Sequence, residues 1–164
     1  MMLTAACSAS HGGDGSENAA GEQLERAGIA AGLVADPAAA PLDGIWSRDT
    51  DRMCILPRLG DSDGSTRRIG VVLDYGEGQG CVARGTLKRR GAQLNVAFGD
   101  CRFAARFDGE SIQFPAALPN ACERLCTGRA TMSALIVERI STSTAEARTL
   151  RSGDGGAMCD DRAG

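Results

Sequence analysis

Cysteine is the residue type with the clearest chemical potential in this chain of 164 residues. Seven cysteines are spread along the chain, with no CxxC pair: Cys7, Cys54, Cys81, Cys101, Cys122, Cys126 and Cys159. A zinc site needs about four Cys or His ligands at short spacings, and the single histidine, His11, lies in a polar stretch. We therefore expect no metal site. An odd count indicates one special thiol and an even remainder, so we expect Cys7 to stand apart and the others to form three disulfides in an oxidising compartment.

The stretch LTAAC, Leu3 to Cys7, resembles the lipobox of bacterial lipoproteins, in which an apolar residue and small residues directly precede a cysteine. The resemblance implies cleavage after Ala6, a diacylglyceryl group on the Cys7 thiol and an acylated amine, with palmitate as an expected acyl group. Thr4 departs from the usual Leu of the motif. A signal peptide needs about 7–15 apolar residues before its cleavage site, so we interpret residues 1–6 as a remnant whose true start lies upstream. Ser8, rather than Asp, after the cysteine implies outer-membrane retention facing the periplasm.

Residues 7–43 have the composition of a lipid-anchored, flexible tether. The segment SASHGGDGSENAAGE is rich in Ser, Gly and Ala and has no apolar period. The stretch from Glu22 to Val34 predicts a short helix, which Pro37 and Pro41 would end. We expect the folded domain to start near Gly44.

Bulk charge excludes one large class of partner. The net charge is −3, without a long block of one sign, and nucleic-acid binding needs a basic face that the composition does not indicate. No stretch approaches the roughly 20 apolar residues that span a bilayer as a helix. We therefore expect no nucleic-acid partner, and membrane attachment only through acyl chains on Cys7.

From Gly44 to about Phe114, apolar and polar residues alternate as they do in strands with one solvated face. In CRFAARF, for example, Cys101 and the aromatic residues share one face, while Arg102 and Arg106 occupy the other. The segments IGVVLDY, AQLNVAF and SIQF alternate in the same way. Turn signals at Arg90-Gly91, Gly99-Asp100 and Asp108-Gly109 leave gaps of about two residues, so these strands form tight hairpins in a meander.

The C-terminal part predicts two short helices and one further strand. Asn120 with Glu123, and Ser143 with Glu146, have the spacing of capping boxes. TMSALIVERI lies between them and has the character of a strand. We therefore predict a mainly β domain over residues 44–164. A small antiparallel meander closing into a barrel is expected because closure removes exposed strand edges, with a two-layer sandwich as the alternative.

Strand register gives an expected disulfide pairing. A hairpin turning at Arg90-Gly91 with its apolar faces together pairs Leu87 with Leu94, which brings Cys81 beside Cys101. Cys122 and Cys126 are four residues apart, a distance that one helical turn makes bridgeable. Cys54 then remains for Cys159.

Motifs that carry chemistry elsewhere have plainer interpretations here. GEGQG (76–80) lies between strands, whereas a phosphate loop opens a helix. DSDG (61–64) has alternating carboxylates but no distal Glu, as a calcium loop would require. LKRR (87–90) is a basic hairpin tip that could meet lipid phosphates or an acidic partner, although a solvated turn is the plainer interpretation. No histidine lies in the domain to act as a base, and the paired carboxylates that remain are Asp100 with Asp108 or Glu123. We therefore expect no catalytic residue and no cofactor.

GIW (44–46) followed by MCIL (53–56) resembles the start of periplasmic β-barrel inhibitors of bacterial metalloproteases, which begin with a Gly-x-Trp strand and then a Cys-containing strand. The match covers about a dozen residues, the later cysteines do not follow that pattern, and no inhibitory residue is carried over. The sequence predicts an envelope lipoprotein whose domain is a non-catalytic binding or inhibitory module acting on another envelope protein. The alternative is a carrier that holds a small apolar ligand in the barrel interior, and an enzyme is the third hypothesis.

Overall fold

The computed structural model describes residues 14–160, with side chains from residue 19. It divides into two units, residues 1–34 and 35–164. The first unit contains one helix, α1 (Asp14–Ala30), which begins earlier and ends earlier than the helix expected over residues 22–34. Part of the predicted tether is thus helical. No helix in the described residues is long and apolar enough to cross a bilayer.

The second unit consists of nine strands and two single-turn helices within the described residues. The strands are β1 (Gly44–Arg48), β2 (Asp51–Pro57), β3 (Thr66–Asp74), β4 (Gly80–Arg90), β5 (Gln93–Phe98), β6 (Cys101–Phe107), β7 (Ser111–Gln113), β8 (Cys126–Thr127) and β9 (Ile136–Ser141). The helices are α2 (Asn120–Glu123) and α3 (Thr144–Ala147).

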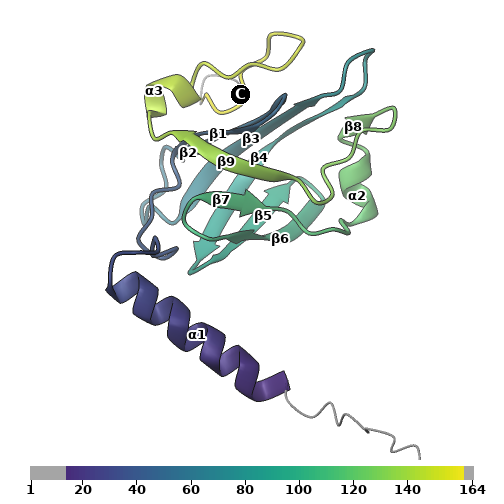
Figure 1. Ribbon diagram of the computed structural model, residues 1–164. Helices are drawn as coiled ribbons and strands as arrows, with labels where there is room; N and C mark the ends of the chain where they lie inside the picture. Colours follow the sequence, from purple (N-terminus) through teal and green to yellow (C-terminus); the bar gives the residue numbers. More distant parts are fainter. Residues whose placement is uncertain (1–13, 161–164) are drawn as a thin grey trace, which may run out of the picture. The chain divides into compact units, whose positions relative to one another are not determined.

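Eight strands form a closed antiparallel barrel in the order β3-β2-β1-β9-β7-β6-β5-β4 (Figure 1). Pairing between β3 and β4 closes it, along a register that runs from Thr66 opposite Lys88 to Asp74 opposite Gly80. The predicted meander and barrel are therefore confirmed, and the sandwich alternative is wrong. Closure suits this sequence because short strands with one apolar face bury that face around a common axis.

Side chains fill the barrel interior. Trp46, Phe107 and Phe114 are the largest of its fully buried residues. The Trp46 and Phe107 rings meet edge to face at 5.9 Å between centroids, and Phe103 meets Phe114 in the same manner at 4.6 Å. Such contacts add to the stabilisation from burial alone. The inward faces predicted for the central strands are confirmed.

Two disulfide predictions are wrong: the structure joins Cys81 to Cys126 and Cys101 to Cys122. The β4–β5 register is shifted by two residues, with Leu87 opposite Val96, and the pairing stops at Thr86. Beyond that point β4 separates from β5, because strands in a closed barrel are tilted and staggered. A Cβ atom on Gly85 would lie 1.9 Å from the Ala97 carbonyl oxygen, so only glycine fits at the point of separation.

The first two residues of β4, Gly80 and Cys81, pair with β8, which places Cys81 directly opposite Cys126 with 4.0 Å between their Cα atoms. The single turn of α2 packs against β6, where Cys122 reaches Cys101. The segment from α2 to β8 therefore covers the gap beside β5, and a disulfide holds each end of it. The expected link between Cys122 and Cys126 fails because each cysteine faces a different strand.

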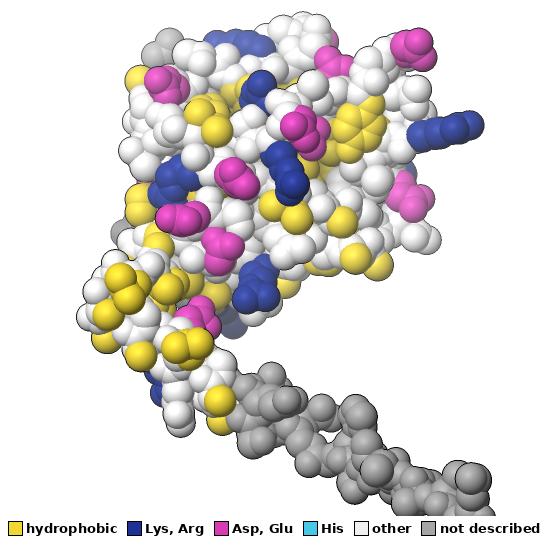
Figure 2. All heavy atoms as spheres, in the orientation of Figure 1, with side chains coloured by type: hydrophobic (Ala, Val, Ile, Leu, Met, Phe, Trp, Pro, Cys, Tyr) yellow, Lys and Arg dark blue, Asp and Glu magenta, His cyan; other side chains and the backbone are white. Residues whose placement is uncertain are grey.

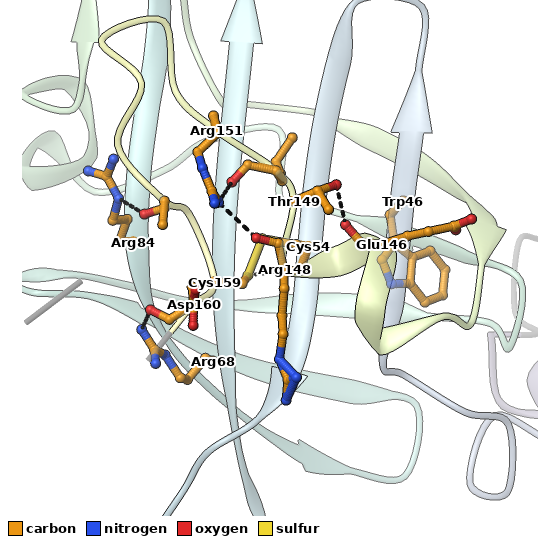
Figure 3. The surroundings of a disulfide bond; sticks show 12 residues. Trp46, Cys54, Arg68, Arg84, Glu146, Arg148, Thr149, Arg151, Cys159 and Asp160 are labelled. Carbon is orange, nitrogen blue, oxygen red and sulfur yellow. Dashed lines mark hydrogen bonds between the residues drawn. A yellow bond between two sulfur atoms is a disulfide. The ribbon is translucent and has the colours of Figure 1, made fainter. Parts of the chain in front are cut away.

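The predicted Cys54–Cys159 disulfide is confirmed. It holds the C-terminal segment against the outside of the barrel, where Leu56, Met158 and Ala147 of α3 form a second apolar cluster. Arg84 donates to the Ala157 carbonyl oxygen at 2.8 Å, and the same segment lies across β2 to β4 in Figure 3. This part of the barrel exterior is therefore covered by the protein's own chain.

Residues 35–43 belong to the barrel unit, although the sequence placed them in the tether. Trp46 Nε1 donates to the Leu42 carbonyl oxygen at 3.0 Å, and Arg89 donates to that of Ala40 at 2.8 Å. Arg139 donates to the Pro41 carbonyl oxygen at 2.6 Å and lies over the Trp46 ring at 4.8 Å. Burial lowers the pKa of both guanidinium groups, yet they keep backbone partners. These contacts could not be read from spacing alone.

Of the two predicted capping boxes, one forms by half, because the Ser143 amide donates to the Ser141 hydroxyl oxygen rather than to Glu146. The Ser143 hydroxyl oxygen accepts a hydrogen bond from the Glu146 amide, and this caps α3, although that helix ends well before Arg151. Asn120 instead lies inside the first turn of α2, behind Pro119, and no side chain caps that helix. The strand expected from Thr131 starts only at Ile136, because residues before it form turns.

Removing the three disulfides one pair at a time should lower stability by amounts that follow the length of the closed loop. The chain-entropy model gives about 3 kcal/mol for the 21-residue separation of Cys101–Cys122 and about 5 kcal/mol for the 105-residue separation of Cys54–Cys159. Paired Cys→Ala variants, compared by urea unfolding, should show that order. Peptide mapping without reductant is the control, and a fragment linking Cys81 to Cys101 would contradict the pairing.

Candidate functional site

The outward face of β4, β5 and β6 carries a group of four exposed cations that make no hydrogen bond or ion pair within residues 19–160. Across these three strands the register forms three rows: Thr86, Ala97 and Arg102; Lys88, Asn95 and Ala104; Arg90, Gln93 and Arg106. Alternate residues of a strand point to the same side, so the three rows share one surface. We call Lys88, Arg90, Arg102 and Arg106 the basic face.

A surface hollow of about 540 Å³ lies on the basic face. Its lining residues are Thr86, Lys88, Arg90, Asn95, Val96, Ala97, Arg102 and Phe103. Neutral side chains of β5 lie in the middle, and cations stand on both flanking strands. The hollow therefore offers charged and neutral hydrogen-bond donors to whatever enters it.

The cations of the basic face differ from the arginines that hold the chain of the barrel unit together. Arg84, Arg89 and Arg139 each donate to backbone carbonyl groups and so hold segments of the chain in place. Within residues 19–160, the four side chains of the basic face make no hydrogen bond or ion pair. Their charge is consequently available to a partner.

A second hollow, of about 570 Å³, has the opposite character. It is lined by Asp108, Glu110, Ser111, Glu138 and Arg139, at the β6–β7 turn and on β9. Figure 2 shows acidic side chains gathered over the β7 and β9 region, with basic ones among them. Converging carboxylates would favour an enzyme. The hydrogen bonds and the pKa of Asp108 therefore decide how well this hollow is suited to acid–base catalysis.

Asp108 is committed to the turn. One carboxylate oxygen accepts from the Ser111 amide at 2.6 Å and the Glu110 amide at 2.9 Å, and the other accepts from the Ser111 hydroxyl at 2.6 Å. Partial desolvation acts to raise the pKa of Asp108, but the bonds from Ser111 and Glu110 outweigh it and the pKa is lowered. A carboxylate held ionised in this way is a poor proton donor near neutral pH.

The sequence leaves two carboxylate pairs possible, and the structure separates one of them. Asp100 precedes β6 and Asp108 follows it, so the two lie at opposite ends of that strand. Asp100 and Glu123 are the neighbours of the bridged Cys101 and Cys122, and Arg124 approaches Asp100 at 4.0 Å on the exposed surface. Over residues 14–160, no group of three His, Cys, Asp or Glu side chains is arranged to hold a metal ion.

The remaining motifs form turns. In DSDG, Asp61 accepts from the Thr66 amide and Asp63 from the Ser65 amide, as carboxylates do in ordinary loops. GEGQG connects β3 to β4 and opens no helix, as expected. Lys88 to Arg90 form the last residues of β4, directly before the turn to β5, and the outward Lys88 and Arg90 lie on the same surface as Arg102 and Arg106 of β6.

The basic face was only partly visible in the sequence. Alternation predicts the outward positions of Arg102 and Arg106, and LKRR is basic. Only the β4–β5–β6 register, however, brings these cations of β4 and β6 onto one surface. Cys7, His11 and residues 1–6 lie outside the described residues. No protein-family model matches the sequence, and the curated proteins and solved structures likewise gave no match.

Replacing Asp108 by Ala should destabilise the barrel by about 1–2 kcal/mol, since three hydrogen bonds are lost at an exposed turn where water replaces part of them. Because folding lowers this pKa, the contribution is full above the unfolded pKa of about 3.9 and disappears as the pH falls through the folded pKa. Urea unfolding of both proteins between pH 7 and pH 2 measures the difference.

Asp100→Ala is the matched control, because Asp100 lies at the neighbouring hairpin and makes only a distant surface ion pair. An equal loss of stability in both variants, or a difference from wild type that does not change with pH, would contradict this role of Asp108.

Proposed function

We propose that this protein is a non-catalytic binding module that acts on another protein of the bacterial envelope through the basic face. The observation that carries the proposal is a group of four exposed cations without a described partner on one outward face, of which Lys88, Arg90 and Arg102 line a surface hollow, in a chain whose net charge is −3. Exposed charges that make no hydrogen bond or ion pair and gather beside a hollow are suited to recognition, because complementary charge guides and orients association.

The filled interior favours surface binding over the carrier alternative. A carrier needs an apolar cavity, and binding cavities for small molecules are commonly about 300–1,000 Å³. Here Trp46, Phe107 and Phe114 occupy the interior. The hollows on the basic face and at Asp108 lie on the surface and are lined largely by charged and polar groups. An apolar ligand would have to displace packed aromatic rings.

An enzymatic role has less support. The acidic hollow holds Asp108 in a turn, with a lowered pKa, and Arg139 is engaged by backbone carbonyl groups. Inhibition of an envelope enzyme is one form that surface binding can take, and the resemblance of GIW and MCIL, now seen in β1 and β2, is in keeping with it.

We further propose that acyl chains on Cys7 anchor the protein to the outer membrane, facing the periplasm. Three disulfides in the barrel unit are in keeping with an oxidising compartment. Two or three acyl chains anchor a protein firmly, whereas one does not.

Expression of the full gene with labelled palmitate tests the anchor. The wild-type protein should carry the label and sediment with membranes, and Cys7→Ser should do neither, because the thiol is the acceptor. Cys54→Ser is the control for a general effect of cysteine loss. Equal labelling of wild type and Cys7→Ser would contradict the anchor.

A photo-cross-linking residue at Asn95 should link the full chain to an envelope protein in living cells, because Asn95 lies in the hollow. The double variant Arg90→Glu/Arg102→Glu should reduce the cross-linked product at least about tenfold, since it replaces attraction by repulsion at two positions. Mass spectrometry of the product measures both results.

Arg48→Glu/Arg129→Glu is the matched control: it makes the same charge change at exposed arginines away from the hollow. A cross-linker at Ile140, which is 65% exposed on β9, reports on another surface. A product that forms from Ile140 but not from Asn95, or that both double variants reduce equally, would overturn the proposed surface.

A further inference from the structure

The basic face has a repeat that matches an extended chain. Its three rows are two residues apart along the strands, which corresponds to about 7 Å between rows. An extended polypeptide places every second side chain on the same side with the same repeat. A strand-like segment lying along β5 would therefore present one side chain to each row.

Neutral residues occupy the middle of every row. Gln93, Asn95 and Ala97 of β5 are flanked by β4 and β6 at about 4.8 Å on either side. Arg90 and Arg106 flank Gln93, Lys88 flanks Asn95, and Arg102 lies in the row of Ala97. The result is a path over β5 with short or neutral side chains as its floor and at least one cation beside each row.

The chemistry of the flanks selects carboxylates. A guanidinium group presents a planar fork of donors that matches a carboxylate in two parallel hydrogen bonds, and a lysine adds three donors. The amides of Gln93 and Asn95 on the floor can pair with the backbone of an incoming segment. A bilayer surface fits less well, because it is broad and does not enter a hollow of about 540 Å³ between side chains.

We propose that the basic face binds an extended acidic segment of its partner protein, with Asp or Glu at alternate positions, lying along β5. This rests on the proposed function and names the partner's chemistry. Three successive carboxylates would meet the rows of Arg102, Lys88 and Arg90 with Arg106, while the intervening side chains of the segment face away from the barrel.

Two synthetic peptides of the same composition test the repeat. One alternates Glu and Ser over ten residues, and the other places five Glu before five Ser. The full chain, titrated with each at low salt, should bind the alternating peptide at least about fivefold more tightly. Arg102→Ser and Arg90→Ser should each weaken that binding roughly fivefold, in line with loss of one exposed ion pair of good geometry. Arg129→Ser, an exposed arginine elsewhere, should leave it unchanged.

Equal affinity for the two peptides would overturn the alternating register, and vesicles of anionic phospholipid that bind more tightly than either peptide would overturn the protein segment as occupant. Self-association of the chain that the alternating peptide does not displace would assign the face to a second copy and also overturn it. If Asn95 cross-links an envelope protein while neither peptide binds, the inference fails and the proposed function remains. If the alternating peptide binds and Asn95 yields no cross-link, the proposed function fails.

Discussion

The structure depends on how β4 divides its pairing. Along one edge it pairs with β3 from Gly80 to Arg90 and closes the barrel. Along the other edge only its second half pairs with β5, and its first residues pair with β8. A barrel of tilted strands cannot keep one long strand in register with a short neighbour along its whole length. The separation of β4 from β5 at Gly85 therefore follows from closing the barrel. Two of the three disulfides hold the segment that covers the resulting gap.

This division explains why the barrel exterior has two kinds of surface. Where β4 leaves β5, α2 and β8 cover the gap, and on the other side the C-terminal segment covers β2 to β4 through Cys54–Cys159 and Arg84. Coverage stops at the second half of β4. There the outward residues of three strands are left to solvent, and they include the four cations of the basic face. The surface proposed for binding is thus the part of the sheet that the chain does not use for itself.

Much of the fold follows from patterns within single segments, and the errors arise where distant segments meet. Alternation predicted the inward faces of β5 and β6, and the strand edges argued for a closed barrel. The Cys81 partner was missed because the hairpin argument treated β4 and β5 as an isolated pair. The same limit applied to the site: Lys88, Arg90, Arg102 and Arg106 were all visible as outward or basic residues, but their rows depend on the two-residue register shift. Asn120 failed as a cap because Pro119 places it within the turn.

The neutral outward residues of β5 reduce the electrostatic repulsion within the basic face. Like charges directly opposite each other on neighbouring strands are destabilising, and here every cation lies opposite a neutral residue of β5. Arg90 and Arg106 share a row but have Gln93 between them, which about doubles their separation. Repulsion among the four charges remains, and it is relieved by anything that brings negative charge to the face. Binding of the proposed acidic segment would therefore stabilise the folded barrel, because a ligand that binds only the folded state stabilises it. The repulsion among the four cations weakens the unbound sheet slightly. The same repulsion would favour an anionic partner over a neutral one, because only an anionic partner relieves it.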